Sequence, residues 1–236
     1  MIISGIQKLT LLDYPEKVAC TLFTYGCNLR CPFCHNSEIV VKEAHDLISE
    51  DSFFKFLDTR KGILDAVCIS GGEPLLNMDI MDFIKQIKDR GFLVKLDTNG
   101  TQPSRLQCVC DTGLVDYVAM DVKNSIDKYS VTCGVDKIVV GKVIQSVNYL
   151  MSQNKFDYEF RTTVTKSFHT HEDIESLTQW IKGCSHYYIQ KYISSDSVID
   201  PTCLEWDNET LKDFLAIAKR NIPNAELRGV DFNDPN

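Results

Sequence analysis

Short apolar runs alternate with longer amphipathic runs along most of the chain, and the two kinds of run have different periods. The apolar runs are rich in β-branched and aromatic residues, which favour β-strands. In the amphipathic runs, apolar residues recur at helical spacing, as in Ile80, Phe83, Ile84 and Ile87. The strands predicted in this way are Val18–Thr24, Ala66–Ser70, Leu93–Thr98, Tyr117–Val122, Tyr158–Val164 and Tyr187–Tyr192.

Each predicted strand is followed by an amphipathic run, so the pattern predicts a repeat of strand and helix. Ser49 and Thr170 stand directly before two of these runs. Both suit helix N-caps, because their hydroxyls accept hydrogen bonds from the free N–H groups of the first turn. The predicted helices are Glu50–Arg60, Met78–Arg90, Pro103–Thr112, Lys142–Gln153, His171–Lys182 and Asn208–Arg220.

Six strand-then-helix units in a row predict an α/β fold with a parallel sheet. A closed eight-unit barrel usually needs about 250 residues, and this chain has 236. We therefore expect a partial (β/α)6 barrel with parallel strands, and a doubly wound sheet is the alternative. The chain is predicted to be one domain, 1–236, with its core at 16–195. A C-terminal helix and a possible edge strand at Leu227–Val230 fall within 205–230.

Composition and charge exclude several classes of function. The 25 Lys and Arg residues are outnumbered by 33 Asp and Glu, which gives a formal net charge of −8. Nothing in that balance suggests the basic surface of a nucleic-acid-binding protein. No apolar stretch approaches the roughly 18 residues of a membrane span, and residues 1–10 lack the pattern of an export signal. We therefore expect a cytoplasmic protein without nucleic-acid or membrane partners.

Three of the ten cysteines, Cys27, Cys31 and Cys34, lie within eight residues directly after the first predicted strand. In a reducing compartment, such cysteines point to metal binding, catalysis or burial. Thiolates suit iron–sulfur clusters and zinc, and closed sites of both kinds normally take four protein ligands. Because this segment supplies only three, it leaves one metal position open for a substrate.

Several other interpretations of the same cysteines stay open. Cys31-Pro-Phe-Cys34-His35 also matches the attachment pattern of c-type haem. A Cys-x-x-Cys redox pair is a further possibility, but it and the haem leave Cys27 without a role. A zinc site of three cysteines and His35 requires ligation by two adjacent residues, Cys34 and His35. Burial of three inert thiols fits poorly with a segment rich in Gly, Asn, Arg and Pro.

The spacing Cys-x3-Cys-x2-Cys, with aromatic Phe33 before the last cysteine, resembles the signature of the radical S-adenosylmethionine (SAM) superfamily. The resemblance implies that Cys27, Cys31 and Cys34 bind a [4Fe–4S] cluster. By the same resemblance, the methionyl amine and carboxylate of SAM bind the fourth iron. One electron from the cluster then cleaves SAM to methionine and a 5′-deoxyadenosyl radical, so the cofactors carry the difficult chemistry.

The segment Ser70-Gly-Gly-Glu-Pro74 follows the second predicted strand. The glycines permit close approach of the backbone to a ligand, and proline favours an irregular segment with free carbonyls. A Gly-Gly pair alone is explained by an ordinary turn. In combination with the cysteine motif, however, Gly71, Gly72, Glu73 and Pro74 resemble the superfamily's binding element for the methionyl amine.

Two further acidic segments follow the third and fourth predicted strands, Asp97-Thr-Asn-Gly100 and Met120-Asp-Val-Lys123. Both resemble elements of the activases of glycyl radical enzymes. The resemblance implies a small monovalent cation beside the SAM carboxylate and a direct contact between lysine and SAM. The residues assigned to SAM and this cation are Asp97, Thr98, Asn99, Asp121 and Lys123.

Two residues within later strands are weaker candidates for the same site. Arg161 has the charge to pair with a carboxylate, and Gln190 has polar groups that suit adenosine. A single polar residue in a strand is more often explained by packing or surface position. Cys108 and Cys110 are expected on a helix with structural roles rather than at an auxiliary cluster.

The N-terminal segment Gly5–Pro15, the cysteine motif and Cys34-His35-Asn36 together resemble the activases of anaerobic ribonucleotide reductase and pyruvate formate-lyase. The resemblance covers roughly residues 1–195. It implies abstraction of a glycine α-hydrogen from a partner glycyl radical enzyme, with anaerobic ribonucleoside-triphosphate reductase as the first choice. A reductant such as flavodoxin or ferredoxin is also implied.

Other functions remain as alternatives to this activase. The chain could activate pyruvate formate-lyase or a related lyase, or act on a small molecule or peptide. A thiolate metal-binding or electron-carrier module without catalysis is the alternative from another class. The segments around Gly71 and Asp121 argue against a plain carrier, which needs no second ligand site.

Overall fold

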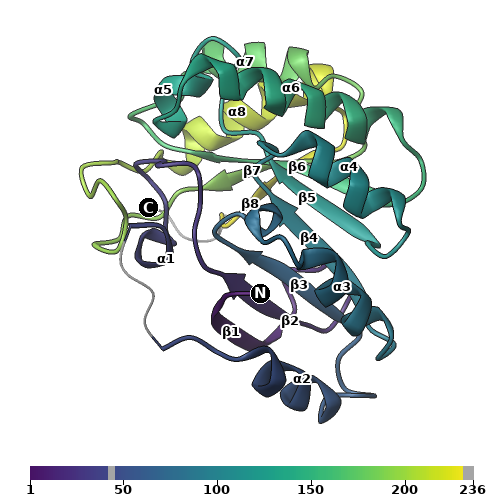
Figure 1. Ribbon diagram of the computed structural model, residues 1–236. Coiled ribbons are helices and arrows are strands. Elements are labelled where there is room, and N and C mark those ends of the chain that lie inside the picture. Colours follow the sequence, from purple (N-terminus) through teal and green to yellow (C-terminus); the bar gives the residue numbers. More distant parts are fainter. Residues whose placement is uncertain (42–45, 231–236) are drawn as a thin grey trace.

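The computed structural model describes residues 1–41 and 46–230, and its strands form one eight-stranded sheet in the order of the sequence (Figure 1). The first strand runs antiparallel to the second, and each later strand runs parallel to its neighbour. The strands are β1 Ile3–Thr10, β2 Ala19–Thr24, β3 Ala66–Gly71, β4 Leu93–Thr98, β5 Tyr117–Asp121, β6 Asp157–Val164, β7 Tyr187–Lys191 and β8 Ala225–Arg228.

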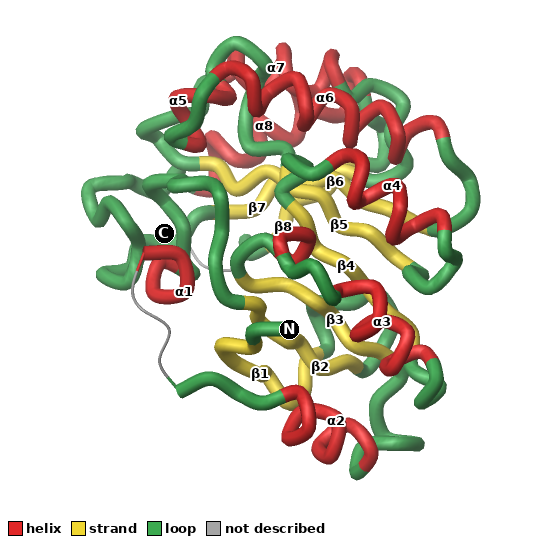
Figure 2. Tube along the Cα trace, in the orientation of Figure 1, coloured by secondary structure: helices red, strands yellow, loops and turns green. Residues whose placement is uncertain are grey.

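The sheet is curved but not closed (Figure 2). Within the described part of the chain, no ladder joins β8 back to β1. Each central strand pairs in register with the next, so that Thr98 lies beside Met120, and Asp121 beside Arg161. Parallel pairing brings the carboxyl ends of the strands to one edge. The prediction of a partial α/β barrel with parallel strands is confirmed, and the doubly wound alternative is wrong.

Most of the helices lie along one side of the sheet in Figure 1, and the short helix of residues 37–41 lies apart from them. The predicted N-caps are both confirmed: Ser49 accepts a hydrogen bond from the N–H of Ser52, and Thr170 forms a capping box with Asp173. The helices are α1 Ser37–Val41, α2 Glu50–Asp58, the 3-10 helix η1 Pro74–Leu76, α3 Ile80–Lys88, α4 Pro103–Asp111, α5 Tyr129–Cys133, α6 Lys137–Ser152, α7 His171–Trp180 and α8 Asn208–Asn221.

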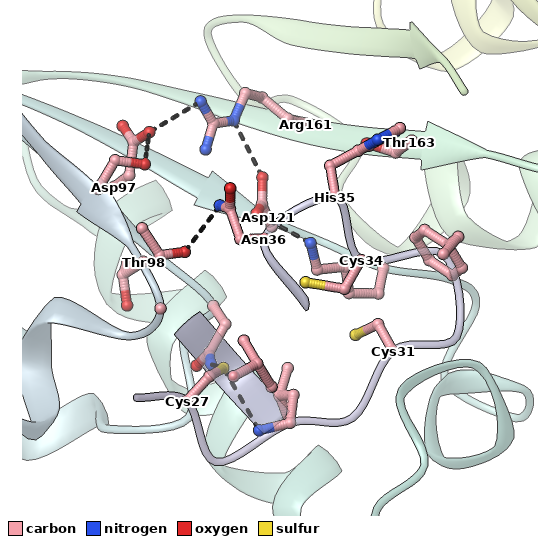
Figure 3. A pocket seen from close by; sticks show the side chains of 18 of the residues that line it. Cys27, Cys31, Cys34, His35, Asn36, Asp97, Thr98, Asp121, Arg161 and Thr163 are labelled. Carbon is pink, nitrogen blue, oxygen red and sulfur yellow. Dashed lines mark hydrogen bonds and ion pairs between the residues drawn. The ribbon is translucent and has the colours of Figure 1, made fainter. Parts of the chain in front are cut away.

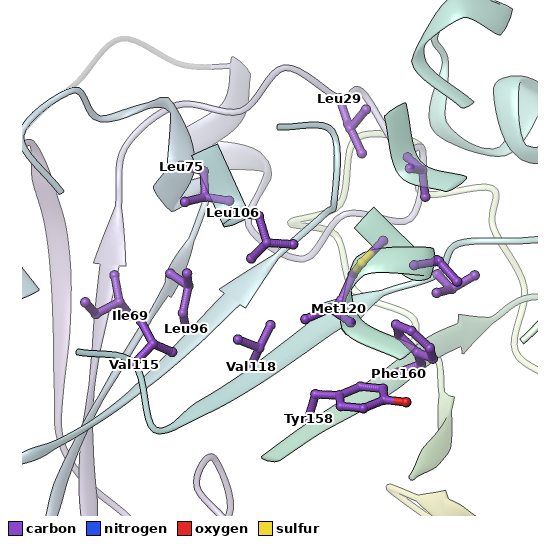
Figure 4. Close-up of a cluster of buried hydrophobic side chains, with 14 of the residues drawn as sticks. Leu29, Ile69, Leu75, Leu96, Leu106, Val115, Val118, Met120, Tyr158 and Phe160 are labelled. Carbon is purple, nitrogen blue, oxygen red and sulfur yellow. The ribbon is translucent and has the colours of Figure 1, made fainter. Parts of the chain in front are cut away.

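The core lies between the convex face of the sheet and the helices (Figure 4). Side chains of a strand point alternately to its two faces. Leu96 of β4, Val118 of β5 and Phe160 of β6 are fully buried in this core. The neighbouring positions in the same strands, such as Asp97 and Arg161, therefore point to the inside of the barrel. The alternation places polar residues in the interior without disturbing the core.

A second, smaller cluster closes the barrel at the amino-terminal ends of the strands. The segment between β1 and β2 passes beneath the sheet, and Tyr14 packs on Tyr117 of β5 with ring centroids 5.6 Å apart. Asp13 in the same segment accepts a hydrogen bond from the hydroxyl of Thr21. The N-terminal segment that resembles activases therefore packs against the amino-terminal ends of the strands and covers that end of the barrel.

The sequence analysis missed three elements and misplaced the bounds of others. Strand β1 was not predicted, and neither were the short helices α1 and α5. Helix α6 begins at Lys137 rather than at Lys142. The predicted edge strand exists as β8, slightly earlier than Leu227–Val230, and pairs in parallel with β7. Among the described residues, no helix has the length and apolar character needed to cross a bilayer.

Candidate active site

A cavity of about 490 Å³ opens at the carboxyl ends of the strands, inside the barrel (Figure 3). It brings together almost all of the residues that the sequence singles out. Glu73 and Pro74 are not among the lining residues, although both lie in the turn that borders the cavity. The predicted site residues that line it are Cys27, Cys31, Cys34, Gly71, Gly72, Asp97, Thr98, Asn99, Asp121, Lys123, Arg161 and Gln190.

The three thiols of the cavity differ in their surroundings. Burial raises the pKa of Cys27 to about 11, and burial also raises the pKa of Cys34. Cys31 is different, because a hydrogen bond from the thiol of Cys133 outweighs its burial and lowers its pKa to about 7. The Leu29 N–H donates to Cys27 Sγ at 3.4 Å. All three cysteines therefore line one pocket, but the pKa is raised for Cys27 and Cys34 and lowered for Cys31.

The donor set fits an iron–sulfur cluster by its chemistry. Three thiols face one cavity, and soft thiolates are the usual ligands of such clusters. Among the described side chains, no three from His, Cys, Asp or Glu are placed to hold a single metal ion. A [4Fe–4S] cluster bonds its cysteines to separate irons, so thiols that are spread around a pocket are compatible with it.

The turn after β3 lies directly against the segment that carries the cysteines. Gly72 donates its N–H to the carbonyl of Thr24 at 2.9 Å, and Glu73 donates to the carbonyl of Gly26 at 2.8 Å. A Cβ atom on Gly72 would lie 1.9 Å from the Gly26 oxygen. Gly71 has φ of +104°, which disfavours any side chain. These glycines are required for close backbone contact as well as for an open pocket.

Glu73 connects this turn to the end of β4. Its carboxylate accepts hydrogen bonds from the Leu75 N–H at 3.1 Å, the Thr98 hydroxyl at 2.8 Å and the Asn99 N–H at 2.7 Å. The side chain is completely buried, and burial raises its pKa to about 7. The structure therefore shows Glu73 joining two of the segments that border the cavity.

A chain of alternating charges crosses the interior from β4 to the end of β5. Lys95 Nζ lies 2.8 Å from Asp97 Oδ1. The Arg161 guanidinium then spans the two acids, 3.2 Å from Asp97 and 3.0 Å from Asp121. Lys123 Nζ contacts Asp121 at 2.9 Å. The two predicted acids are thus held by three basic side chains.

The charge chain fixes the ionisation of its members. Burial would raise the pKa of Asp121, but Arg161 and Lys123 outweigh it and lower the pKa to about 2. Burial likewise opposes the charge of Lys123, yet Asp121 and the nearby Cys31 hold its pKa above the usual value. The pKa of Asp97 is lowered for the same kind of reason, chiefly by Arg161. Two basic side chains that line the cavity, Lys123 and Arg161, are therefore held in their charged forms beside acidic neighbours, and either can pair with a carboxylate ligand.

Sequence reasoning missed a histidine that supports this charge chain. His169 is fully buried and accepts a hydrogen bond from the Thr165 N–H at its Nδ1, so its Nε2–H donates to the Lys123 carbonyl at 2.8 Å. Burial lowers the His169 pKa and keeps the ring neutral. Asp13, which also lines the cavity, was missed as well. No local pattern marks His169, because the Lys123 carbonyl that it contacts lies far away in the sequence. Asp13 lies within the N-terminal segment that resembles activases, but it was not singled out as a site residue.

The open parallel α/β barrel and the cavity with three thiols at the carboxyl ends of its strands define the class of fold and of site. The model of the radical SAM superfamily matches residues 21–181, and the chain belongs to that superfamily. A provisionally named glycyl-radical enzyme activating enzyme of Methanocaldococcus jannaschii is 35% identical over 98% of this chain and 97% of its own length.

Solved structures agree on the fold. SuiB of Streptococcus suis bound to S-adenosylmethionine has a TM-score of 0.62 at 17% identity, covering 89% of this chain and 52% of SuiB. Methylornithine synthase has a TM-score of 0.63 at 12% identity, covering 89% of this chain and 63% of the synthase. The chain is thus a radical SAM enzyme, and membership implies a [4Fe–4S] cluster and SAM as cofactors.

Proposed function

We propose that this enzyme is an activase that abstracts an α-hydrogen from a backbone glycine of a partner glycyl radical enzyme. The observation that carries the proposal is its 35% identity over nearly the whole chain to a relative named for that activity. The charged cavity supports it, because an enzyme that cleaves SAM needs a site for the cofactor beside the thiols. A metal-binding module without catalysis would not need this second site.

In this proposal Cys27, Cys31 and Cys34 hold the cluster. When bound, the cluster supplies the electron that cleaves SAM to methionine and a 5′-deoxyadenosyl radical. The turn at Gly71 and Gly72 faces the methionyl amine, and Glu73 with Pro74 keeps the turn in place. Lys123 and Arg161 receive the carboxylate, and Asn99 and Gln190 offer polar groups to the remainder of SAM. Asp121 orients the two basic side chains through the contacts described above.

A monovalent cation beside the SAM carboxylate is a separate part of the proposal. Asp97, Thr98 and Asp121 provide oxygen atoms, which suit a hard cation. Arg161 already contacts both acids, so a bound cation must share them with it. We expect weaker SAM binding when tetramethylammonium replaces sodium and potassium in the buffer. Equal SAM affinity in both buffers would contradict the cation site and would leave Arg161 as the countercharge of the two acids.

The partner we propose is the anaerobic ribonucleoside-triphosphate reductase, with flavodoxin or ferredoxin as the reductant. A protein substrate is favoured because the sheet is open between β1 and β8, which offers a loop a way into the barrel. The target hydrogen must approach the radical carbon closely, so the glycine has to enter the cavity.

The compartment we propose is the cytoplasm. All ten cysteines are free thiols, which suits a reducing compartment.

The test is to mix the reduced, cluster-loaded enzyme with SAM and the reductase under strict anaerobiosis. We expect a doublet glycyl-radical signal on the reductase and one 5′-deoxyadenosine for each radical. Pyruvate formate-lyase serves as a second partner, and a signal only on that enzyme would reassign the target. If deoxyadenosine forms only with an added small molecule and no glycyl radical enzyme acquires the signal, the activase proposal is wrong.

A further inference from the structure

The turn that follows β4 carries an asparagine, Asn99, whose amide group has a defined orientation. The N–H of Thr101 and the Thr101 hydroxyl both donate to Asn99 Oδ1, at 3.0 and 2.7 Å. A backbone N–H can only donate, so the atom that faces it must be the amide oxygen. The amide nitrogen of Asn99 therefore lies on the other side of the group, and its two N–H bonds need other acceptors.

The amide nitrogen of Asn99 points at the segment that carries the cysteines. It donates to Asn28 Oδ1 at 3.0 Å and to Cys27 Sγ at 3.7 Å, a longer separation because sulfur is the larger atom. The same sulfur also accepts the N–H of Leu29 at 3.4 Å. Cys27 therefore receives one donor from its own segment and one from the end of β4, 72 residues away in the sequence.

A closed ring of three side chains keeps the amide in this orientation. Asn28 Nδ2 donates to the Thr101 hydroxyl at 2.8 Å, and that hydroxyl donates its own proton to Asn99 Oδ1. Each of the three residues thus donates to one neighbour and accepts from the other. Asn99 and Thr101 are only 6% and 1% exposed, so water competes little for their contacts, whereas Asn28 is exposed.

The backbone of the turn is anchored on both sides of this side chain. The N–H of Asn99 donates to the buried carboxylate of Glu73 at 2.7 Å. The next residue, Gly100, has φ of +74°, and its carbonyl accepts a hydrogen bond from the hydroxyl of Ser146 in α6 at 2.7 Å. A side chain on a backbone held in this way keeps its donor in one position relative to Cys27.

We infer that Asn99 is a positioning residue whose amide donates a hydrogen bond to the cluster ligand Cys27 and so raises the reduction potential of the cluster. The inference rests on the proposed function, because it requires that Cys27 bind the cluster. Hydrogen bonds to the sulfurs of a cluster help to set its potential. Reduction adds negative charge to the cluster and its thiolates, so a fixed donor stabilises the reduced form more than the oxidised form. This effect is independent of any contact between Asn99 and SAM.

The experiment removes the donor in two ways and measures the cluster without SAM. Asn99→Ala deletes the amide, and Asn99→Ser keeps a hydroxyl that can accept the Thr101 N–H but is too short to reach Cys27. Asn28→Ala is the matched control, because it removes an amide from the same ring beside Cys27 and leaves the donor to the sulfur in place. Each loaded protein is analysed for iron and titrated potentiometrically, with electron paramagnetic resonance as the readout. At a fixed potential we expect the reduced-to-oxidised ratio to fall about fivefold in both Asn99 variants, the effect of one typical hydrogen bond, and to stay near the wild type in Asn28→Ala.

Several outcomes would overturn the inference alone. An unchanged potential in both Asn99 variants with a complete cluster would make Asn99 a structural residue of the turn. An equal fall in Asn28→Ala would show that the lost donor to Cys27 is not the cause. Loss of iron from both Asn99 variants would mean that Asn99 holds the cysteine segment in place and does not tune the cluster. A fall that appears only after SAM is added would assign Asn99 to SAM. A wild-type chain that binds no iron–sulfur cluster would instead overturn the proposed function together with this inference.

Discussion

At the scale of single residues, the site cysteines differ from the others in facing one cavity. Cys27, Cys31 and Cys34 line it, whereas Cys108 is exposed on α4 and Cys110 is buried there. Replacing any of the three by Ala should abolish the reducible cluster, because an open iron leaves no spare protein ligand. Iron analysis and electron paramagnetic resonance after anaerobic reconstitution measure this. Ala at Cys108 or Cys110 should leave both signals intact, and zinc in place of iron would contradict the assignment.

Lys123 is the basic side chain that joins the charge chain to the cysteines. Its ammonium contacts Asp121 at 2.9 Å, and its pKa is raised by Asp121 and by Cys31. Lys123→Met should leave the cluster in place but weaken SAM binding roughly tenfold, as expected for one lost charge-assisted contact. Isothermal titration measures the affinity. Lys128→Met is the control, because Lys128 pairs with Asp173 away from the cavity, and a similar loss there would contradict the assigned role of Lys123.

Glu73 gives the stability of the protein a defined pH dependence. Its pKa is about 7 in the folded chain, against an ordinary value of 4.5, because of burial. The folded state therefore holds this proton more tightly, so stability is highest below the ordinary pKa and falls until pH reaches about 7. Between pH 5.5 and 7 the wild type should lose roughly 2 kcal/mol relative to Glu73→Gln. Denaturant unfolding of both proteins over this range measures the difference, and parallel curves would contradict it.

Single residues were predictable from the sequence where a local motif marks them. The thiols, the glycines after β3 and the polar positions at strand ends all follow from spacing and strand alternation. His169 was not predictable, because the Lys123 carbonyl that it contacts belongs to a segment far away in the sequence. Glu73 was marked by its motif, but only the fold shows that it is buried behind the turn.

At the scale of elements, the central strands were predicted almost to the residue, and the failures have physical causes. β4 was predicted with its observed bounds, because it is buried on both faces and flanked by turn residues. β1 is an edge strand in which three consecutive residues are exposed, so it lacks a hydrophobic alternation. Helix α6 begins before Gly141, a residue that normally weakens a helix and obscured its start. The five-residue helices α1 and α5 are too short to show a period.

In the turn between β3 and η1, the backbone packs so closely on the cysteine segment that Gly72 leaves no room for a side chain. A Cβ on Gly72 would lie 1.9 Å from the Gly26 oxygen, and the N–H groups of Gly72 and Glu73 donate hydrogen bonds to the segment that carries Gly26. Gly72→Ala should therefore displace the cysteine segment, lower the melting temperature and reduce cluster loading. Thermal unfolding and iron content measure the two effects. Gly141→Ala on α6 is the control, because a Cβ there meets nothing within 4 Å, and it should be neutral or stabilising.

At the scale of the whole molecule, an open sheet needs support at its last strand, which pairs on one side only within the described residues. Glu159 of β6 is fully buried and forms two contacts with Arg228 of the edge strand β8, at 2.8 and 2.9 Å. It also accepts a hydrogen bond from the Tyr117 hydroxyl of β5 at 2.9 Å. Arg228 in turn lies over the ring of Tyr188 in β7, 3.3 Å from its centroid. One buried carboxylate therefore joins strands from β5 to β8 across the interior.

Removal of Arg228 tests whether this network holds the open end together. Arg228→Met leaves the Glu159 carboxylate buried without its countercharge, and breaking a buried pair in this way costs about 3 kcal/mol or more. The double variant Glu159→Gln, Arg228→Met should recover much of that loss, because it removes the unpaired charge as well. Denaturant unfolding of the wild type, the single and the double variants measures the coupling. Lys55→Met, which breaks an ion pair exposed on α2, should leave the unfolding midpoint unchanged. If Arg228→Met were as mild as Lys55→Met, the edge strand would be held by its backbone ladder to β7 and by α8, and the buried pair would contribute nothing to the open end of the barrel.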